Sequence, residues 1–387
     1  MKELIFINSH PIQYFTPMYQ QMQSEGMPIE VWYCSDESIR GAVDLEFNTQ
    51  VKWDIPLLEG YPYQFFKNYA RKPSIYGGFT GLINWGIIRK LSKHPKSVIV
   101  VHGWHYLTHL LVLLLGKAVG HTVCLRCDAA ENQEALKKGW LQGFKYLGFK
   151  YLLFPCIDYF LYVGTQNRRF YEKHGIAGKR LINSPYAVDN QRFTEQFKKL
   201  KKDRDTLRQN MHVPLQAKII LFTAKYIEKK RPLDLIKAFQ QLNDPDCWLI
   251  MVGTGPLQES LQTYIHTQKL NRVILTGFVN QNAISDYYAI SDVFVMCSGA
   301  GENWGLSVNE AMNFNLPIIV SDQTGCSIDL VVEGRNGYVF PTGEVDALAQ
   351  RLKWVLTDKR LTHIPDSAEI IQPYSYDSTI ESLRSLL

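Results

Sequence analysis

Short apolar runs and amphipathic runs alternate along the whole chain. The apolar runs are rich in Val, Ile, Leu and Phe, and such runs predict strands that are buried on both faces of a parallel sheet. Between them, apolar positions recur every three or four residues, for example over 232–242 and 256–268, which predicts helices. The predicted strands are 3–8, 29–34, 97–103, 122–127 and 159–164 in the first half, and 218–224, 247–253, 272–278, 292–298, 316–322 and 337–340 in the second.

The alternation of strands and helices predicts an α/β protein, because crossover helices cover both faces of a parallel sheet. Two such series follow one another, and a chain of 387 residues suits two domains of roughly 100–200 residues each. We predict two Rossmann-like, doubly wound domains, 1–187 and 190–371, that face each other across a cleft. In such sheets ligands bind beyond the carboxyl ends of the strands, so functional residues are expected directly after the strands.

The composition adds limits on compartment and partners. Apolar residues make up 46% of the chain and charged residues 20%, but no apolar stretch reaches the ~18 residues that a membrane span needs. The seven cysteines show no framework spacing, which favours a reducing, cytoplasmic compartment, and Cys124 and Cys127 are predicted to be buried strand residues. The mild net charge of +5 gives no reason to expect a nucleic-acid partner.

The segment 136–160 interleaves lysines with aromatic residues and leucines. Two interpretations stand. The segment is a helix that lies on an anionic membrane surface, or it is a core helix with basic edges. Its lysines are Lys137, Lys138, Lys145 and Lys150.

Several strand-end features in the second half point to a phosphorylated ligand. Lys225 and Lys230 follow one strand, and Gly253 and Gly255 precede a helix that starts near Pro256. A helix N-terminus binds phosphate oxygens, and two lysines neutralise a diphosphate. These features predict a pocket for a nucleoside diphosphate.

The stretch "GENWGLSVNEAM" (301–312) places two glutamates with seven residues between them. Glu302 stands among glycines at a helix mouth, and Glu310 stands inside the helix, about 10 Å further along. That separation is too large for one acid/base pair, but it suits two parts of one elongated ligand.

With these motifs, the second half resembles the retaining glycosyltransferases of family 4, which have the GT-B fold. Glu302 and Glu310 match the Glu-x7-Glu motif of the family, and Lys225 and Lys230 match its two basic residues, the first of which is usually arginine. The resemblance covers about 220–345 with high specificity and the first half more loosely. Two further departures are Gly325-Cys326 in place of a double glycine, and "NSHPIQYFTP" (8–17) in place of a glycine-rich loop.

The resemblance implies roles for particular residues. Glu310 accepts hydrogen bonds from the ribose hydroxyls, Glu302 lies close to the transferred sugar, and Lys225 and Lys230 stabilise the charge that develops on the diphosphate. The expected catalytic residues are Glu302, the two lysines and His102, which faces the donor sugar. The other expected donor-binding residues are Gly253, Gly255, Phe278, Val279, Ser298, Asn303, Trp304, Gly305 and Leu306, with the base at 278–279 and the diphosphate on the backbone of 303–306.

The first half is expected to bind the acceptor. Arg126 and Asp128 lie at the end of a strand. They either contact the acceptor or form a mutual salt bridge, and the sequence fits both interpretations. His105, His10 and Gln13 are further acceptor-side candidates. By resemblance, a C-terminal helix in 372–387 packs back on the first domain.

The implied activity is transfer of a sugar, with retention, from a nucleotide-diphosphate sugar to a glycan or lipid-linked acceptor in cell-surface polysaccharide synthesis. No Asp-x-Asp metal motif with the expected context occurs, so we expect no metal and no other cofactor. The expected location is the cytoplasm, with peripheral contact to the inner face of the cell membrane through 136–160. Two alternatives are a GT-B nucleotide-sugar epimerase and a catalytically silent subunit that binds a nucleotide sugar.

Overall fold

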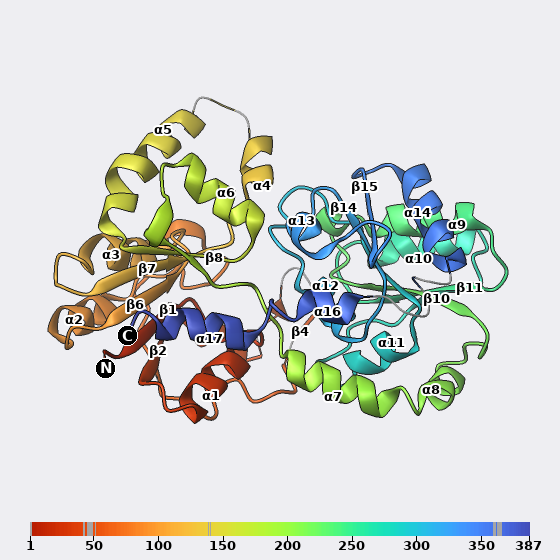
Figure 1. Ribbon diagram of the computed structural model, residues 1–387, viewed down its shortest axis with the longest axis horizontal. Coiled ribbons are helices and arrows are strands. Elements are labelled where there is room, and N and C mark those ends of the chain that lie inside the picture. Colours follow the sequence, from red (N-terminus) through yellow and green to blue (C-terminus); the bar gives the residue numbers. More distant parts are fainter. Residues whose placement is uncertain are drawn as a thin grey trace. The chain divides into compact units, whose positions relative to one another are not determined.

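The computed structural model describes residues 2–41, 43–44, 49–50, 52–137, 139, 141–358, 361 and 366–387. The chain forms two compact units. The first consists of Met1–Ala42, Ile55–Tyr186 and Tyr376–Leu387, and the second of Val43–Asp54 and Ala187–Ser375. Figure 1 shows that each unit is an α/β sandwich with a twisted sheet between helices. Each unit is a doubly wound, Rossmann-like domain, as the strand pattern predicted.

The first unit holds a sheet of seven parallel strands in the order β5-β2-β1-β6-β7-β8-β9. Alternate strand residues pack into a core with α2, α3 and α6, and the other face packs against α1 and α17, which lie side by side (Figure 1). The strands are β1 (Leu4–Asn8), β2 (Ile29–Tyr33), β5 (Tyr63–Phe65), β6 (Val98–His102), β7 (Thr122–Arg126), β8 (Tyr159–Tyr162) and β9 (Leu181–Asn183), and the helices are α1 (Thr16–Ser24), α2 (Trp85–Lys93), α3 (Leu107–Leu115), α4 (Glu131–Leu136), α5 (Leu141–Gly148), α6 (Thr165–Lys173) and α17 (Tyr376–Arg384).

The second unit holds a sheet of six parallel strands in the order β12-β11-β10-β13-β14-β15. In Figure 1, α9, α10 and α14 cover one face of this sheet, and α7, α8 and α11 cover the other. The strands are β10 (Lys218–Thr223), β11 (Cys247–Val252), β12 (Val273–Leu275), β13 (Val293–Met296), β14 (Ile318–Ser321) and β15 (Gly337–Phe340), and the helices are α7 (Asn190–Leu200), α8 (Arg204–Asn210), α9 (Pro232–Leu242), α10 (Gln258–Thr267), α11 (Ile284–Ile290), α12 (Leu306–Asn313), α13 (Ser327–Leu330), α14 (Val345–Thr357) and α16 (Ser367–Ile371).

The units depart from the predicted domain boundaries at one internal place. The segment 43–54, predicted to lie within a continuous first domain, clusters with the second unit. It contains the short antiparallel pair β3 (Val43–Asp44) and β4 (Thr49–Gln50). Its described residues are held there by the ion pair of Asp44 with Lys225 and by hydrogen bonds that Asn280 and Asn282 donate. The helix α17 lies in the first unit, where the Tyr376 hydroxyl donates to the Tyr14 carbonyl oxygen at 2.9 Å.

The two cysteines predicted to be buried in a strand are buried. Cys124 lies within β7 and Cys127 follows directly after it, and both are free thiols. Burial raises the pKa of the Cys127 thiol to about 12, which keeps it protonated and unreactive.

Candidate functional site

In each unit the strand order reverses direction at one place, and there the loops that follow the strands diverge and leave room for a ligand. In the second unit this switch point lies between β10 and β13. The loop after β10 contains Lys225 and Lys230, and the loop after β13 contains Ser298 and Glu302. The topology therefore brings together four of the residues that the sequence predicted.

The loop that leads into α12 is fixed by close backbone contacts. Gly305 caps the helix with φ +109°, a left-handed conformation that favours glycine, and a Cβ there would lie 2.7 Å from the Met296 Sδ. Gly325 donates its N–H to the Glu302 carbonyl at 3.0 Å, and a Cβ on it would meet the Asn303 carbonyl oxygen at 1.8 Å. The turn 302–305 is thus held rigidly, and the first N–H groups of α12 lie directly behind it.

Cys326 stands where the family has its second glycine, and the structure accommodates it. Its N–H donates to the Trp304 carbonyl at 3.1 Å, and its side chain is completely buried. The Trp304 side chain points into the protein, where its Nε1 donates to the Asn309 Oδ1 at 2.9 Å. The Trp304 side chain is therefore held inside the protein.

Glu302 and Lys230 form a buried ion pair, although they are far apart in the sequence. The Lys230 Nζ donates to the Glu302 Oε2, and only 15% and 10% of the two side chains are exposed. Burial by itself raises the pKa of the Glu302 carboxyl, but the charges of Lys230 and Lys229 outweigh burial, so its pKa lies below the ordinary value. Glu302 is therefore a carboxylate at neutral pH.

Glu310 lies in the second turn of α12 and is 3% exposed. Its Oε2 accepts a hydrogen bond from the Tyr288 hydroxyl at 2.7 Å, and that hydroxyl also lies 2.9 Å from the Thr223 Oγ1. Thr223 is the last residue of β10, so the carboxylate is tied to the strand end at the switch point. The sequence analysis did not anticipate Tyr288, because it stands in an ordinary apolar-periodic helix and has no motif of its own.

The glycines after β11 allow neighbouring loops to approach one another. Gly253 and Gly255 have φ of +147° and +158°. A Cβ on Gly253 would lie 2.0 Å from the Ala224 carbonyl oxygen, and the Gly253 N–H donates to the Gly277 carbonyl at 3.0 Å. The loops that follow β10, β11 and β12 are therefore joined at the carboxyl edge of the sheet.

The remaining predicted donor residues lie along the same edge. Lys225 follows β10, and its Nζ lies 3.2 Å from the Asp44 Oδ2. Phe278 and Val279 follow β12 and are partly exposed. Ser298 is fully buried, and its carbonyl oxygen accepts a hydrogen bond from the Ser321 hydroxyl. The sequence analysis did not anticipate Asp44, because Asp44 is far from Lys225 in the sequence and no pattern marks it.

In the first unit, three neighbouring strands end in polar residues that lie in one row. Asn8, His102 and Arg126 are the last residues of β1, β6 and β7, and the register pairs His102 with Arg126. The Asn8 Oδ1, the His102 Nε2 and the Arg126 Nη1 are all buried, and none has a hydrogen-bond partner among the described residues. This row lies at the switch point of the first sheet, between β1 and β6.

His102 is held neutral by its surroundings. Its ring lies 4.6 Å from the Phe15 ring, measured between centroids. Burial, together with the charge of Arg126, holds the pKa of His102 well below its ordinary value. A neutral imidazole at this place can donate or accept one hydrogen bond but carries no charge at neutral pH.

Two alternatives were open for Arg126 and Asp128, contact with an acceptor or a mutual salt bridge, and among the described residues the salt bridge does not occur. The Arg126 Nη2 instead donates to the carbonyl oxygens of Ser184 and Pro185, at 3.3 and 3.2 Å, and its Nε donates to the Ser184 hydroxyl. The guanidinium turns inward because the following segment offers three acceptors that the sequence pattern does not reveal. Asp128 is partly exposed just beyond it.

The other acceptor-side candidates lie at the same carboxyl edge. His10 and Gln13 are partly buried in the loop after β1, where the His10 Nδ1 lies 2.9 Å from the Ser9 hydroxyl. His105 is exposed in the loop after β6. These three side chains come from the two loops that flank the switch point.

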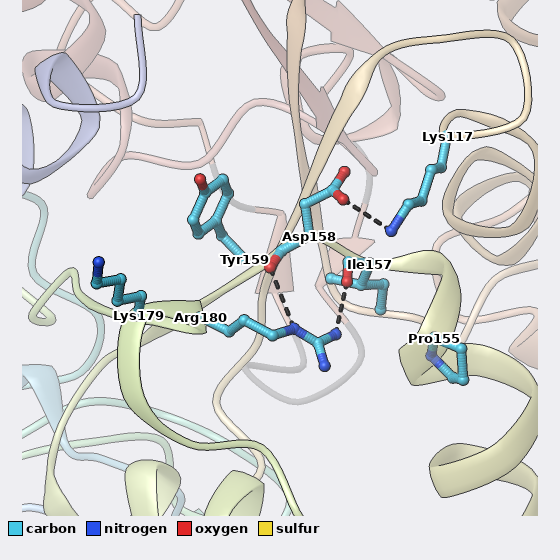
Figure 2. A pocket seen from close by; sticks show the side chains of 7 residues that line it. All are labelled: Lys117, Pro155, Ile157, Asp158, Tyr159, Lys179 and Arg180. Carbon is cyan, nitrogen blue, oxygen red and sulfur yellow. Dashed lines mark hydrogen bonds and ion pairs between the residues drawn. The ribbon is translucent and has the colours of Figure 1, made fainter.

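A separate hollow of about 460 Å³ lies at the opposite edge of the first sheet, where β8 begins. Figure 2 shows that two of its cations are already bonded: Lys117 pairs with Asp158 at 2.9 Å, and Arg180 donates to main-chain carbonyls, including that of Ile157 at 2.6 Å. It lies at the amino ends of the strands, away from the switch point, and we do not count it as part of the candidate site.

The described residues hold no helix long and apolar enough to cross a membrane. Within the same residues, no group of three or more His, Cys, Asp or Glu side chains is arranged to hold a metal ion.

Comparison with known proteins finds a family similar to most of the second unit. Residues 203–372 match the family described as "Glycosyl transferases group 1". The match covers less than half of the chain, and we refer to the matched residues as the group 1 domain after the family that they match. The domain contains all of the predicted donor residues of the second half, from Lys225 to Glu310.

Two curated relatives match part of the chain. Sulfoquinovosyl transferase SQD2 of Arabidopsis thaliana is 29% identical over 151 residues, which is 38% of this chain and 28% of the relative. Alpha-monoglucosyldiacylglycerol synthase of Acholeplasma laidlawii is 31% identical over 168 residues, which is 42% of this chain and 39% of the relative. The chain therefore aligns with well under half the length of each relative.

The whole fold is the GT-B fold of solved glycosyltransferases. Alr3699/HepE from Anabaena matches with a TM-score of 0.76 over 99% of both chains at 16% identity. Sucrose-phosphate synthase from Thermosynechococcus elongatus matches with a TM-score of 0.71 over 100% of this chain and 98% of its own, at 14% identity. Identities this low show the fold alone.

Proposed function

We propose that this protein is a retaining glycosyltransferase that moves a sugar from a nucleotide-diphosphate sugar to a glycan or lipid-linked acceptor. The observation that carries the proposal is the switch point of the group 1 domain, where a buried Lys230–Glu302 pair lies beside the N-terminus of α12. Buried ion pairs cost desolvation energy and are retained where function needs them, which is how we interpret this one. Anabaena HepE, of the same fold, has been solved with UDP and with UDP-glucose.

The group 1 domain supplies the positive charge that such a reaction requires. Cleavage of the sugar–phosphate bond leaves a nucleoside diphosphate with increasing negative charge, and preorganised donors stabilise that charge in the transition state. In this chain the donors are Lys225, Lys230 and the first N–H groups of α12. We propose that these groups take the role of a metal, so that transfer proceeds without one.

The proposed step is balanced as follows. The bond between the anomeric carbon and the diphosphate oxygen breaks, and the acceptor hydroxyl oxygen bonds to the same face of that carbon. The hydroxyl proton passes to the departing diphosphate. Glu302 orients the transferred sugar through its hydroxyls, and Glu310 holds the ribose.

We further propose that the setting is cell-surface glycan or glycolipid synthesis at the inner face of the cell membrane. One curated relative, CapM of Staphylococcus aureus, is named for capsular polysaccharide biosynthesis. The segment 136–160 of this chain has a buried side, with Leu153 and Phe154 in the core, and an exposed apolar side. The exposed side chains are Phe144, Leu147, Tyr151 and Leu152, which are 65%, 49%, 63% and 72% exposed.

The exposed apolar side chains of 144–152 are flanked by cations, which suits an anionic lipid surface. Lys150 lies over the ring of Tyr151, and Lys145 lies beside the patch but is paired with Glu134 at 2.8 Å. Co-sedimentation with vesicles tests this part. We expect Phe144→Ser with Leu152→Ser to abolish binding to phosphatidylglycerol vesicles, and equal binding of the double variant would contradict the membrane role.

Donor hydrolysis followed by NMR tests the reaction class, because a glycosyltransferase without acceptor slowly transfers its sugar to water. The protein is incubated with UDP-, GDP-, ADP-, dTDP- and CDP-sugars of α configuration in EDTA. We expect one donor to release the α-anomer first. First release of the β-anomer would contradict retention. A new epimer would favour the epimerase, and nucleotide binding without any turnover, even with acceptor glycans, would favour the silent subunit.

A further inference from the structure

The described residues of the segment 43–54 lie against the donor edge of the group 1 domain. The Asn280 Nδ2 donates to the Lys52 carbonyl oxygen at 2.7 Å. The Asn282 backbone N–H donates to the Asp54 carboxylate at 3.1 Å, and its Nδ2 donates to the Asp54 carbonyl oxygen at 3.1 Å. The loop after β12, which is the expected base-binding loop, therefore holds residues 52–54 by three hydrogen bonds.

Two side chains of this segment reach predicted donor residues. The Trp53 ring packs edge-on against the Phe278 ring, with 6.1 Å between centroids, and both rings are partly exposed. The Asp44 carboxylate lies 3.3 and 3.2 Å from the Lys225 Nζ through its two oxygens. The segment thus contacts both ends of the expected nucleotide, the base and the diphosphate.

We propose that Asp44 and Trp53 are working parts of the donor site, in which Trp53 completes the wall that binds the base and Asp44 competes with the diphosphate for Lys225. This inference rests on the proposed function, because it assumes that a nucleoside diphosphate binds at this edge. Nothing in the family resemblance assigns these two residues.

The two contacts have opposite consequences for affinity. An indole ring beside Phe278 offers a second aromatic face, and stacking of a base on an aromatic ring strengthens binding. A carboxylate on Lys225 occupies the cation that a phosphate oxygen needs, and it repels the incoming diphosphate. Trp53 therefore favours a nucleoside diphosphate over a ligand without a base, and Asp44 weakens both.

Titration calorimetry of the full chain separates the two contacts. The probes are UDP, GDP, ADP, dTDP and CDP, together with inorganic pyrophosphate, which has no base. We expect Trp53→Ala to weaken, by about tenfold, the affinity for the nucleotide that wild type binds. The affinity for pyrophosphate should stay unchanged. We expect Asp44→Asn to strengthen pyrophosphate and nucleotide alike by roughly threefold or more.

The chain offers a matched control for each variant. Asp244 pairs with Lys218 at 3.3 Å, at the opposite end of the same strand as the Asp44–Lys225 pair, so Asp244→Asn removes a similar ion pair away from the site. Trp354, on α14, packs edge-on against Tyr338, on β15, so Trp354→Ala removes a similar ring contact. Neither control is expected to change either affinity.

Each outcome decides a different claim. Equal nucleotide affinity in wild type and Trp53→Ala, or a loss shared with pyrophosphate, would overturn the role of Trp53. Unchanged or weaker pyrophosphate binding in Asp44→Asn would overturn the competition at Lys225. If the wild-type protein binds none of the nucleotides, the proposed function itself fails. A negative result with either variant alone does not have that consequence.

Discussion

Replacing Lys230 with methionine would leave the Glu302 carboxylate buried without its main counter-charge. Removing one partner of a buried ion pair costs about 3–5 kcal/mol of folding free energy. Lys229 remains close enough to lower the Glu302 pKa, so we expect the lower end, about 3 kcal/mol, for the Lys230→Met variant at pH 7. Methionine keeps most of the volume of lysine, so loss of packing adds little.

The direction of the Glu302 pKa shift determines how the stability difference changes with pH. The folded pKa of Glu302 is depressed in wild type, so its contribution to stability is present above the pKa of an unfolded glutamate and is lost as pH falls through the folded value. In the variant, burial raises the pKa of this carboxyl. The stability difference between wild type and variant should therefore be largest at neutral pH and should shrink as pH falls through the raised pKa of the variant and then through the depressed pKa of wild type.

Urea unfolding at several pH values measures this difference. The double variant Lys230→Met with Glu302→Gln serves as the matched control, because it removes both charges and should recover most of the lost stability without recovering nucleotide affinity. A loss below about 1 kcal/mol, or a difference that does not vary between pH 4 and pH 7, would refute the view that this pair is buried and ionised.

Three further predictions concern the same site. Glu302→Ala should cut sugar transfer by about two orders of magnitude or more while the nucleoside diphosphate still binds; near-normal turnover would remove Glu302 from the mechanism. Tyr288→Phe removes the hydroxyl that donates to Glu310, so calorimetry should show a loss of roughly 1–3 kcal/mol in ribonucleotide binding and a smaller loss for the 2′,3′-dideoxy analogue; equal losses would mean that Tyr288 is merely structural. Gly325→Ala places a Cβ 1.8 Å from the Asn303 carbonyl oxygen and should displace the loop, lowering the melting temperature and the nucleotide affinity together; a variant that melts and binds like wild type would show that the loop is free to move.

The regular elements could be predicted because their causes are local. Helix α9 was predicted over 232–242 and has those bounds, since Pro232 begins it and its apolar positions follow the helical period. The buried strands of both sheets carried continuous apolar runs and were found within one to three residues of their ends. The short edge strands β5 and β9 were missed, because Tyr63–Phe65 and Leu181–Asn183 are too short and too exposed to show a pattern.

The pairings within the site could not be predicted in the same way. The spacing of the motifs pointed to Lys230 and to Glu302 separately. Their ion pair depends on two loops that only the strand order brings together. Tyr288 and Asp44 have no motif, and their contacts follow from tertiary packing. Arg126 was expected to face a ligand or Asp128, yet the carbonyl oxygens of Ser184 and Pro185 hold its guanidinium, and no local pattern marks a carbonyl as an acceptor.

The measurement that tests the central claim most directly is a thermal-shift panel of UDP, GDP, ADP, dTDP and CDP, each with and without EDTA, on wild type and on Lys230→Met. A ligand well above its dissociation constant stabilises the folded state by a few kcal/mol. We predict that one nucleotide raises the wild-type melting temperature, that EDTA leaves the shift unchanged, and that the variant loses it. No shift from any nucleotide, or an undiminished shift in Lys230→Met, would contradict the donor site described above.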